Sequence, residues 1–274
     1  MSDIATLLPI LALLMIIGAF AGVLAGLLGV GGGIILVPAF YYTFSGLGYT
    51  SPQLVQICLA TSLATIIFTS IRSVSSHHKK GAVDWDILKT WAPGIILGAV
   101  IGVFVAAELR SNTLLLIFGT LALIIGLYMA FGNSGWRLGE AMPTGIKRAV
   151  LSPIVGFLSV LMGIGGGSFG VPIMTLHGRP IHRAVATAAG FGLIIALPAA
   201  ITFLLTPAPE LNRPPFTIGH VNIAAFLIVI SMTTLTAPLG AKLAHSLNPK
   251  PLKRVFAVFL IFVAINMLRK AYLG

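Results

Sequence analysis

The chain has 274 residues, of which 57% are hydrophobic and only 8% are charged. A soluble domain of this length cannot bury so much apolar surface, so the composition indicates a polytopic helical membrane protein. The formal charge of +11 does not indicate nucleic-acid binding, because the basic residues occur singly or in pairs rather than in one stripe.

The first apolar segment, 4–28, has no basic region before it and no small-residue cleavage site after it. We therefore interpret it as a retained membrane helix, with a cleaved signal peptide as the alternative. Seven more apolar segments have about the length that a helix needs to cross the hydrocarbon. The eight predicted spans lie at about 4–28, 53–71, 87–107, 113–131, 147–163, 182–206, 219–241 and 252–272.

Two glycine-rich motifs interrupt this pattern. Gly31 to Gly33 and Gly165 to Gly167 lie within apolar stretches, and each run precedes a Val-Pro pair. Consecutive glycines hold a regular helix poorly, so each motif predicts a break at membrane depth. The segments that follow, 34–44 and 168–176, are too short to span and are expected to be re-entrant or discontinuous half-helices.

The two halves of the chain resemble each other. A shift of 134 positions superposes the glycine motifs and Pro38 on Pro172, a shift of 126 pairs Thr61 with Thr187, and a shift of 138 pairs Gly81 with Gly219. Because the shift changes only in loops, the pattern predicts a duplication. The expected repeats are 1–131 and 147–274, joined by a central cytoplasmic linker, 132–146, within one integral membrane domain.

The distribution of basic residues predicts that the repeats are inverted. If the segment 72–86 is cytoplasmic and each half-helix returns to its starting side, thirteen basic residues lie inside and four outside. The inside set is Arg72, Lys79, Lys80, Lys89, Arg137, Lys147, Arg148, Arg179, Arg183, Lys242, Lys250, Lys253 and Arg254. The outside set is Arg110, Arg213, Arg269 and Lys270.

Inverted repeats with broken helices are typical of secondary transporters, in which half-helix amino termini converge near the midplane. Their unpaired N–H groups and positive dipole ends favour an anion. We therefore predict that the amides of Gly31, Gly32, Gly33, Gly165, Gly166 and Gly167 bind a small anion. The alternative is that these glycines only let helices cross closely.

Hydroxyl groups near the motifs are further candidates. Thr61, Ser62 and Thr187 are expected to donate hydrogen bonds to the substrate, and Thr65 shares a helical face with Thr61 and Thr69. The alternative for the threonines is back-bonding to their own helix. Candidates for the pathway or gate are Thr65, Arg72, His182 and Arg183, since His177, Arg179, His182 and Arg183 could form a basic vestibule at the cytoplasmic mouth.

Other chemistry finds little support in the sequence. None of the six acidic residues lies inside a predicted span, which disfavours a cation transporter. Cys58 is the only cysteine and has no partner for thiol chemistry, and no His/Cys spacing indicates a metal or haem site. We expect no catalytic residues, no cofactor and no metal.

The paired glycine motifs, Gly29 to Pro38 and Gly163 to Pro172, with Ala60-Thr61-Ser62 and Ala186-Thr187 after them, resemble the sulfite exporter TauE/SafE family of membrane permeases. This resemblance covers nearly the whole chain. It implies a permease of the bacterial cytoplasmic membrane whose cargo is sulfite, a sulfonate or another organosulfur anion. Ala188 stands where Ser62 stands in the first half, so a hydroxyl contact there would be one-sided.

These observations predict an all-α, inverted-repeat secondary transporter that moves a small anion by alternating access. The alternatives are a passive anion channel, a membrane-embedded enzyme or assembly factor, and a structural membrane partner without transport. The expected partners are the anionic substrate and the lipid bilayer, without nucleic acid. The sequence leaves open whether copies assemble into a homo-oligomer.

Overall fold

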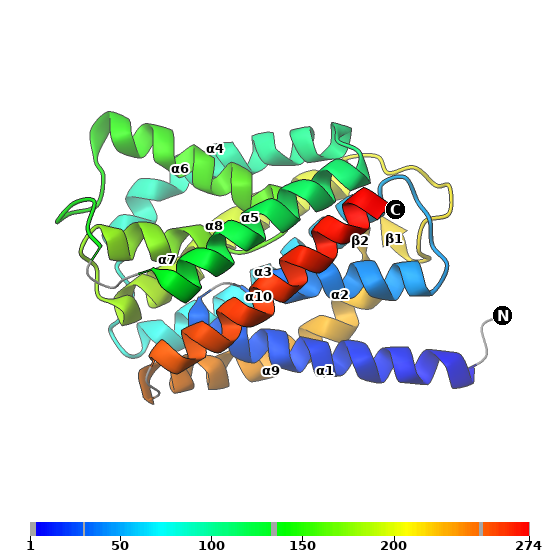
Figure 1. The fold of residues 1–274 in the computed structure, drawn as a ribbon, viewed down its shortest axis with the longest axis horizontal. Helices are drawn as coiled ribbons and strands as arrows, with labels where there is room; N and C mark the ends of the chain where they lie inside the picture. Colours follow the sequence, from blue (N-terminus) through cyan, green and yellow to red (C-terminus); the bar gives the residue numbers. More distant parts are fainter. Residues whose placement is uncertain (1–3, 30, 133–135, 247–248, 274) are drawn as a thin grey trace.

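The structure, a computed structural model, describes residues 4–29, 31–132, 136–246 and 249–273. Within these ranges the chain forms ten helices and one short β-hairpin (Figure 1). The elements are α1 (Ile4–Leu28), α2 (Gly33–Gly46), α3 (Leu54–His78), α4 (Trp85–Glu108), α5 (Ser111–Phe131), α6 (Gly145–Leu161), α7 (Gly167–Leu176), α8 (Ile181–Leu205), β1 (Thr217–Ile218), β2 (Val221–Asn222), α9 (Ile223–Ser246) and α10 (Pro249–Leu273).

Among the described residues, seven helices are long and apolar enough to cross a membrane, namely α1, α3, α4, α5, α8, α9 and α10. This confirms the prediction of an all-helical, multi-pass membrane protein. The eighth predicted span, 147–163, is α6, which has only 17 residues and is not among these long spans. It begins two residues before the predicted span and ends at Leu161, because Gly163 has a φ of 60°, which a right-handed helix does not accommodate.

The helices lie nearly parallel to one long axis (Figure 1). Both chain ends lie at one end of the bundle, together with the α4–α5 connection and the β-hairpin. The helix ends that flank the α3–α4, α5–α6, α7–α8 and α9–α10 connections lie at the other end. We call the latter the basic end, because the segments around these four connections carry the predicted inside residues. Which end faces the cytoplasm stays a prediction.

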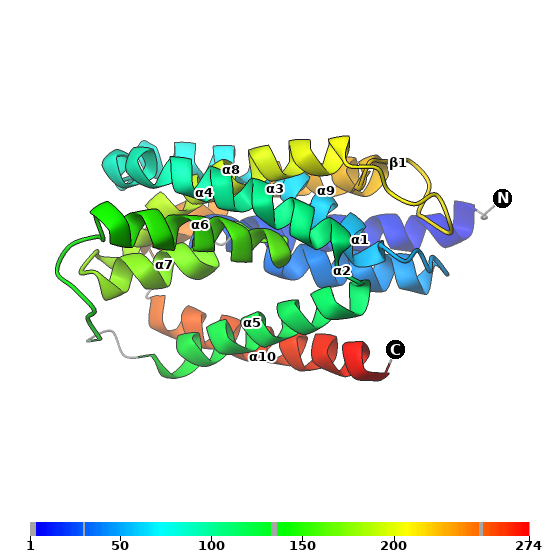
Figure 2. The same ribbon diagram turned by 90° about the horizontal axis from the view of Figure 1, so that it is seen from above.

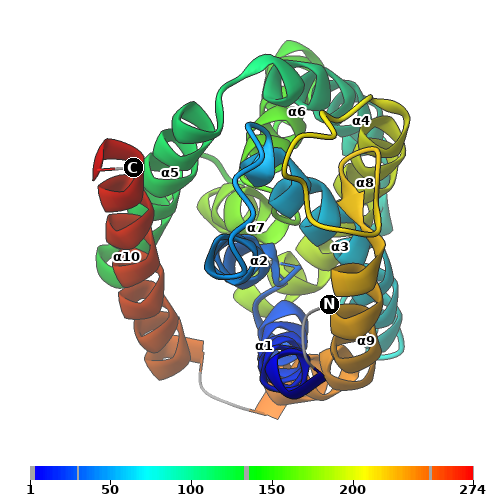
Figure 3. The same cartoon turned by 90° about the vertical axis from the view of Figure 1, so that its right-hand side faces the viewer.

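The helices that pack most closely come in pairs, with one helix from each half of the chain. α1 packs along α9 and α6 packs along α4, while α3 packs against α8 in the centre and α5 against α10. α5 and α10 form a separate layer on one side of the bundle (Figure 2). Viewed along the long axis, α2 and α7 lie inside a ring of longer helices (Figure 3).

Corresponding helices of the halves run in opposite directions along the bundle. α1 leads away from the end that holds the termini, whereas α6 leads toward it (Figure 1). These directions are those that an inverted duplication requires, and we retain that duplication as a prediction. α3 is the most enclosed span, with 83% of its apolar window buried, because it contacts both halves.

Candidate functional site

The two glycine motifs interrupt the helices as predicted from the sequence. Gly29, Gly31 and Gly32 have φ values of 68°, 77° and 79°, and Gly163 has 60°. L-residues with side chains rarely adopt this left-handed conformation, so the glycines are needed to end α1 and α6 and to start the half-helices. α2 then begins at Gly33 and α7 at Gly167, both inside the bundle.

The breaks of the two halves contact each other. A Cβ on Gly31 would lie 3.1 Å from the Gly165 Cα, and a Cβ on Gly33 would overlap the Gly163 carbonyl oxygen. The structure therefore brings together the two motifs, which are 134 positions apart in the sequence. In this conformation the backbones are in direct contact, so an anion enters between them only if this glycine crossing opens.

Other glycines of the motifs are also closely packed. Gly166 lies against Phe191 of α8, and a Cβ on Gly32 would lie 3.0 Å from the Ala21 carbonyl oxygen. Close helix crossing, the alternative weighed above, thus accounts for part of the glycine pattern. This close packing does not test whether the glycine amides bind an anion, so anion binding stays a prediction.

Two serine hydroxyls lie beside the breaks. Ser62 Oγ donates to the Gly163 carbonyl oxygen at 2.8 Å, which ties α3 of the first half to the break of the second. Ser168, in the first turn of α7, is buried, and its Oγ has no hydrogen-bond partner among the described residues. The Ser168 hydroxyl is therefore available near the amino terminus of a half-helix.

Thr61 and Thr187 make matching contacts between the halves. Thr61 Oγ1 accepts from the Asn222 backbone N–H at 2.9 Å, and Thr187 Oγ1 accepts from the Asp84 backbone N–H at 2.9 Å. Thr61 Oγ1 also donates to the Ile57 carbonyl at 2.7 Å. Both threonines are fully buried and hold the start of a helix from the other half.

The remaining threonines of the α3 face bond to their own helix. Thr65 Oγ1 donates to the Thr61 carbonyl at 2.9 Å, and Thr69 Oγ1 donates to the Thr65 carbonyl at 3.0 Å. This is the back-bonding that the sequence left as an alternative. Arg72, one turn further along α3, is exposed.

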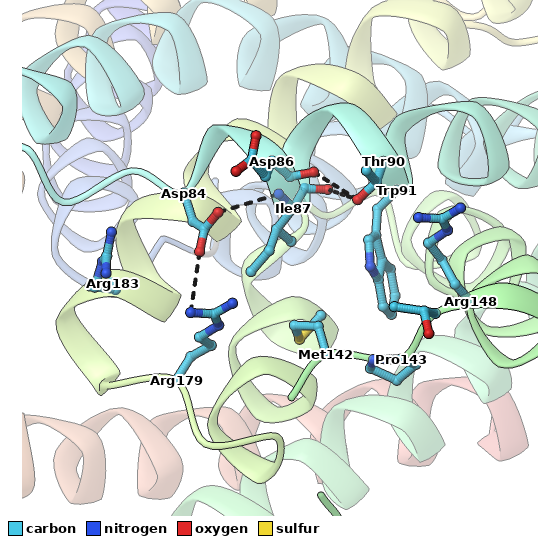
Figure 4. A pocket seen from close by; sticks show the side chains of 11 residues that line it. Asp84, Asp86, Ile87, Thr90, Trp91, Met142, Pro143, Arg148, Arg179 and Arg183 are labelled. Atoms are coloured by element: carbon cyan, nitrogen blue, oxygen red, sulfur yellow. Dashed lines mark hydrogen bonds and ion pairs between the residues drawn. The ribbon is translucent and has the colours of Figure 1, made fainter. Parts of the chain in front are cut away.

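At the basic end, an open cavity of about 390 Å³ lies beside the start of α4 (Figure 4). It is lined by Asp84, Asp86, Ile87, Thr90, Trp91, Met142, Pro143, Thr144, Arg148, Arg179 and Arg183. Of the predicted pathway residues, Arg183 lines this cavity, whereas Thr65, Arg72 and His182 are not in its lining. His182 is exposed at the start of α8.

The sequence analysis does not predict a role for Asp84 or Asn222. Each precedes a helix, and its side chain accepts from that helix, Asp84 from the Ile87 N–H at 3.4 Å and Asn222 from the Ala225 N–H at 2.9 Å. A signal was present, since the shift of 138 that aligns Gly81 with Gly219 also aligns Asp84 with Asn222. Arg148 of the cavity was counted only as an inside charge.

The opposite end contains a buried histidine. His220 Nε2 lies 2.7 Å from Gln53 Oε1, and Gln53 Nε2 donates to the Ala107 carbonyl at 3.0 Å. Burial lowers the pKa of His220 below its ordinary value of 6.5, and the backbone carbonyls of Phe203 and Thr206 partly offset this effect. The imidazole connects the β-hairpin to the end of α4 through Gln53.

In the part of the chain that the structure describes, seven apolar spans and two half-helices that meet inside the bundle make this a multi-pass membrane protein. Bacterial relatives named as membrane transporters fit a location in the bacterial cytoplasmic membrane. The profile of the sulfite exporter TauE/SafE family matches residues 14–267. The chain belongs to this family, which confirms the resemblance seen in the glycine motifs.

Several relatives are similar over nearly their whole length. A probable membrane transporter protein of Haemophilus influenzae is 32% identical over 94% of this chain and 98% of its own. One of Methanocaldococcus jannaschii is 28% identical over 95% and 96%, and YunE of Bacillus subtilis, another probable membrane transporter protein, is 25% identical over 93% and 96%. No solved structure matches the chain. The family and the relatives' names indicate a membrane transporter rather than an enzyme.

Proposed function

We propose that this protein is a secondary transporter that moves a small anion by alternating access, with sulfite, a sulfonate or another organosulfur anion as its cargo. The observation that carries the proposal is the contact between the two half-helix starts at Gly31 and Gly165. Helix amino termini present unpaired N–H groups and a positive dipole end, which favour an anion. The name of the family supports a sulfur oxyanion.

The amides of Gly31 to Gly33 and Gly165 to Gly167 form the proposed binding site. It is reached when the glycine crossing opens toward one end of the bundle. For Thr61, Ser62 and Thr187 to contact the anion, each hydroxyl has to exchange its present backbone partner for it. Ser168 Oγ has no such partner to release among the described residues.

The tight crossing favours a carrier over a passive channel. A channel needs a continuous pathway when it conducts, whereas a carrier closes around its site in every cycle. Saturable counterflow, in which unlabelled sulfite inside vesicles accelerates the uptake of labelled sulfite, separates the two mechanisms. Flux that rises linearly with concentration would indicate a channel.

The direct test is flux of labelled sulfite or a sulfonate into liposomes that contain the purified protein. We expect saturable uptake that protein-free vesicles lack. Gly32→Val should abolish it, because a branched side chain in the left-handed conformation disrupts the start of α2. Gly48→Val is the matched control, since Gly48 has a φ of 86° and open space around it.

We expect Gly48→Val to transport normally. Normal flux would show that a valine in the left-handed conformation does not by itself abolish transport. Both variants are also compared with the parent in thermal unfolding, so that loss of folding is recognised. Equal flux in protein-containing and protein-free vesicles across a panel of sulfur oxyanions would contradict the proposal. Normal flux in a folded Gly32→Val protein would move the site away from the glycines.

A further inference from the structure

The cavity at the basic end combines charges from both halves of the chain. Its three arginines, Arg148, Arg179 and Arg183, belong to the second half, and its two carboxylates, Asp84 and Asp86, belong to the start of α4 in the first half. Figure 4 shows these side chains around one open space. The lining therefore contains three guanidinium groups and two carboxylates, which leaves it with excess positive charge.

Arg179 is only partly paired. Its Nη1 lies 3.6 Å from Asp84 Oδ2, and the Arg179 side chain is 38% exposed. Its Nε is buried without a hydrogen-bond partner among the described residues. A guanidinium carries five N–H donors and binds an oxyanion best through two parallel contacts, so Arg179 retains unused donor capacity. In the described part of the chain no ion pair involves Arg148 or Arg183.

Asp84 connects Arg179 to the place where α8 of the second half contacts the start of α4 in the first, which we call a joint between the halves. Its backbone N–H donates to Thr187 of α8, its Oδ1 accepts from the Ile87 N–H at the start of α4, and its Oδ2 faces Arg179. The Asp84–Arg179 contact thus holds the turn between α7 and α8 against the start of α4. A change in the partner of Arg179 acts directly on that joint.

The opposite end of the bundle has a corresponding contact between the halves, but Asn222 takes the place of the charged Asp84. Asn222 donates its backbone N–H to Thr61 and caps α9, as Asp84 does for α4. Its side-chain amide, however, donates to the Pro215 carbonyl at 2.8 Å and to Thr217 Oγ1 at 3.0 Å, within its own loop. Asp84 at the basic end therefore has an ion pair that an anion could break, whereas the corresponding Asn222 side chain is held by hydrogen bonds within its own loop.

We propose that the cavity between Arg148, Arg179 and Arg183 is an entry site for a small free oxyanion, which displaces Asp84 as the partner of Arg179. This inference rests on the proposed function, since it assumes an anionic cargo. Binding of the oxyanion releases the α7–α8 turn from α4, while the Thr187 hydrogen bond to the Asp84 backbone remains. The carboxylates of Asp84 and Asp86 restrict the cavity to a small anion, because they repel a large polyanion.

The test measures binding of sodium sulfite to the full-length protein in a zwitterionic detergent by calorimetry. Arg179→Gln should weaken binding about tenfold or more, the value of a charge-assisted contact. Asp84→Asn should tighten binding about two- to fivefold, because it removes the competing carboxylate but keeps a helix cap. Arg213→Gln is the matched control at the other end, where Arg213 pairs with Glu210, and should bind like the parent.

Asp84→Asn distinguishes the two interpretations most clearly. The entry site predicts that this substitution tightens sulfite binding, whereas an ion pair that only maintains the structure predicts that its loss weakens binding. Weaker binding by Asp84→Asn, or unchanged binding by Arg179→Gln, would overturn the entry site. A second arm adds phosphatidylglycerol to the detergent micelles. If this lipid binds in an Arg179-dependent way and sulfite does not compete with it, the cavity is a headgroup site and the proposal fails.

The liposome assay separates this inference from the proposed function. Saturable sulfite flux that is lost in Gly32→Val but unchanged in Arg179→Gln would keep the transporter and remove the entry site. Arg179-dependent sulfite binding without any flux would keep the anion site and remove the transporter.

Discussion

His220 illustrates how a single residue can link the pH of the medium to the stability of the fold. Its ring is buried in the β-hairpin loop, contacts Gln53 and packs edge-on against Phe203. Burial lowers the pKa of His220 because the charged imidazolium loses its hydration. The folded protein therefore binds this proton less readily than the unfolded chain does.

We predict that the stability due to His220 is fully present above the ordinary pKa of 6.5 and is lost as the pH falls from there through the lowered pKa of the folded state. His220→Gln should flatten this part of the dependence, because the glutamine does not titrate. The measurement is thermal unfolding of both proteins between about pH 8 and about pH 5, since linkage follows the proton difference. Parallel curves for the two proteins would contradict the prediction.

Among the elements, the starts of α4 and α9 are held by threonines from the other half. Threonines in apolar spans are usually expected to face a pathway or bond to their own helix. Thr61 does bond to its own helix, at Ile57, but its hydroxyl also accepts from Asn222, 161 positions away. Helix-period reasoning cannot see this second role, because the acceptor lone pair is used by a distant segment.

We predict that Thr61→Val and Thr187→Val each lower the free energy of unfolding by about 1–3 kcal/mol, because each leaves a backbone N–H at a helix start without its acceptor. Thr65→Val is the matched control, since Thr65 Oγ1 donates to the Thr61 carbonyl of its own helix, and should cost less than about 1 kcal/mol. Reversible unfolding in mild detergent measures all three. Equal losses would show that the contacts with Asn222 and Asp84 add no stability.

For the molecule as a whole, the loops that carry the predicted inside charges lie at one end of the bundle. From this distribution the positive-inside rule predicts that the basic end faces the cytoplasm. The cavity of the entry site would open on that side. The other end carries both termini and the loop that contains Leu211, whose side chain is 67% exposed.

We predict that a membrane-impermeant maleimide applied to intact cells labels Leu211→Cys but not Lys80→Cys, each made in a Cys58→Ala background. Both positions are exposed, whereas Cys58 is buried and should stay unlabelled in the parent protein. Permeabilised cells should label both variants, which controls for reactivity. Labelling of Lys80→Cys alone in intact cells would place the basic end outside.

The sequence by itself determined the membrane class, the positions of most helices and the two breaks. These are local properties, because hydropathy over about 20 residues selects a span and consecutive glycines permit the left-handed backbone that ends one. The duplicated spacing also indicated which segments correspond. The bounds of α3 depart most from the expected spans, since this helix continues to His78, and α6 ends at Leu161, just before the break at Gly163.

Only the tertiary structure decided how the polar groups are used. Packing of α3 against α8 brings the two halves together at the motifs and at Thr61 and Thr187, which find backbone partners in the other half. Packing of α4 against α6 and α8 gathers arginines beside the start of α4. Such partners come from segments far apart in the chain, and the free energy that selects them arises from burial and hydrogen bonding across helices. No window of the sequence contains both members of these pairs.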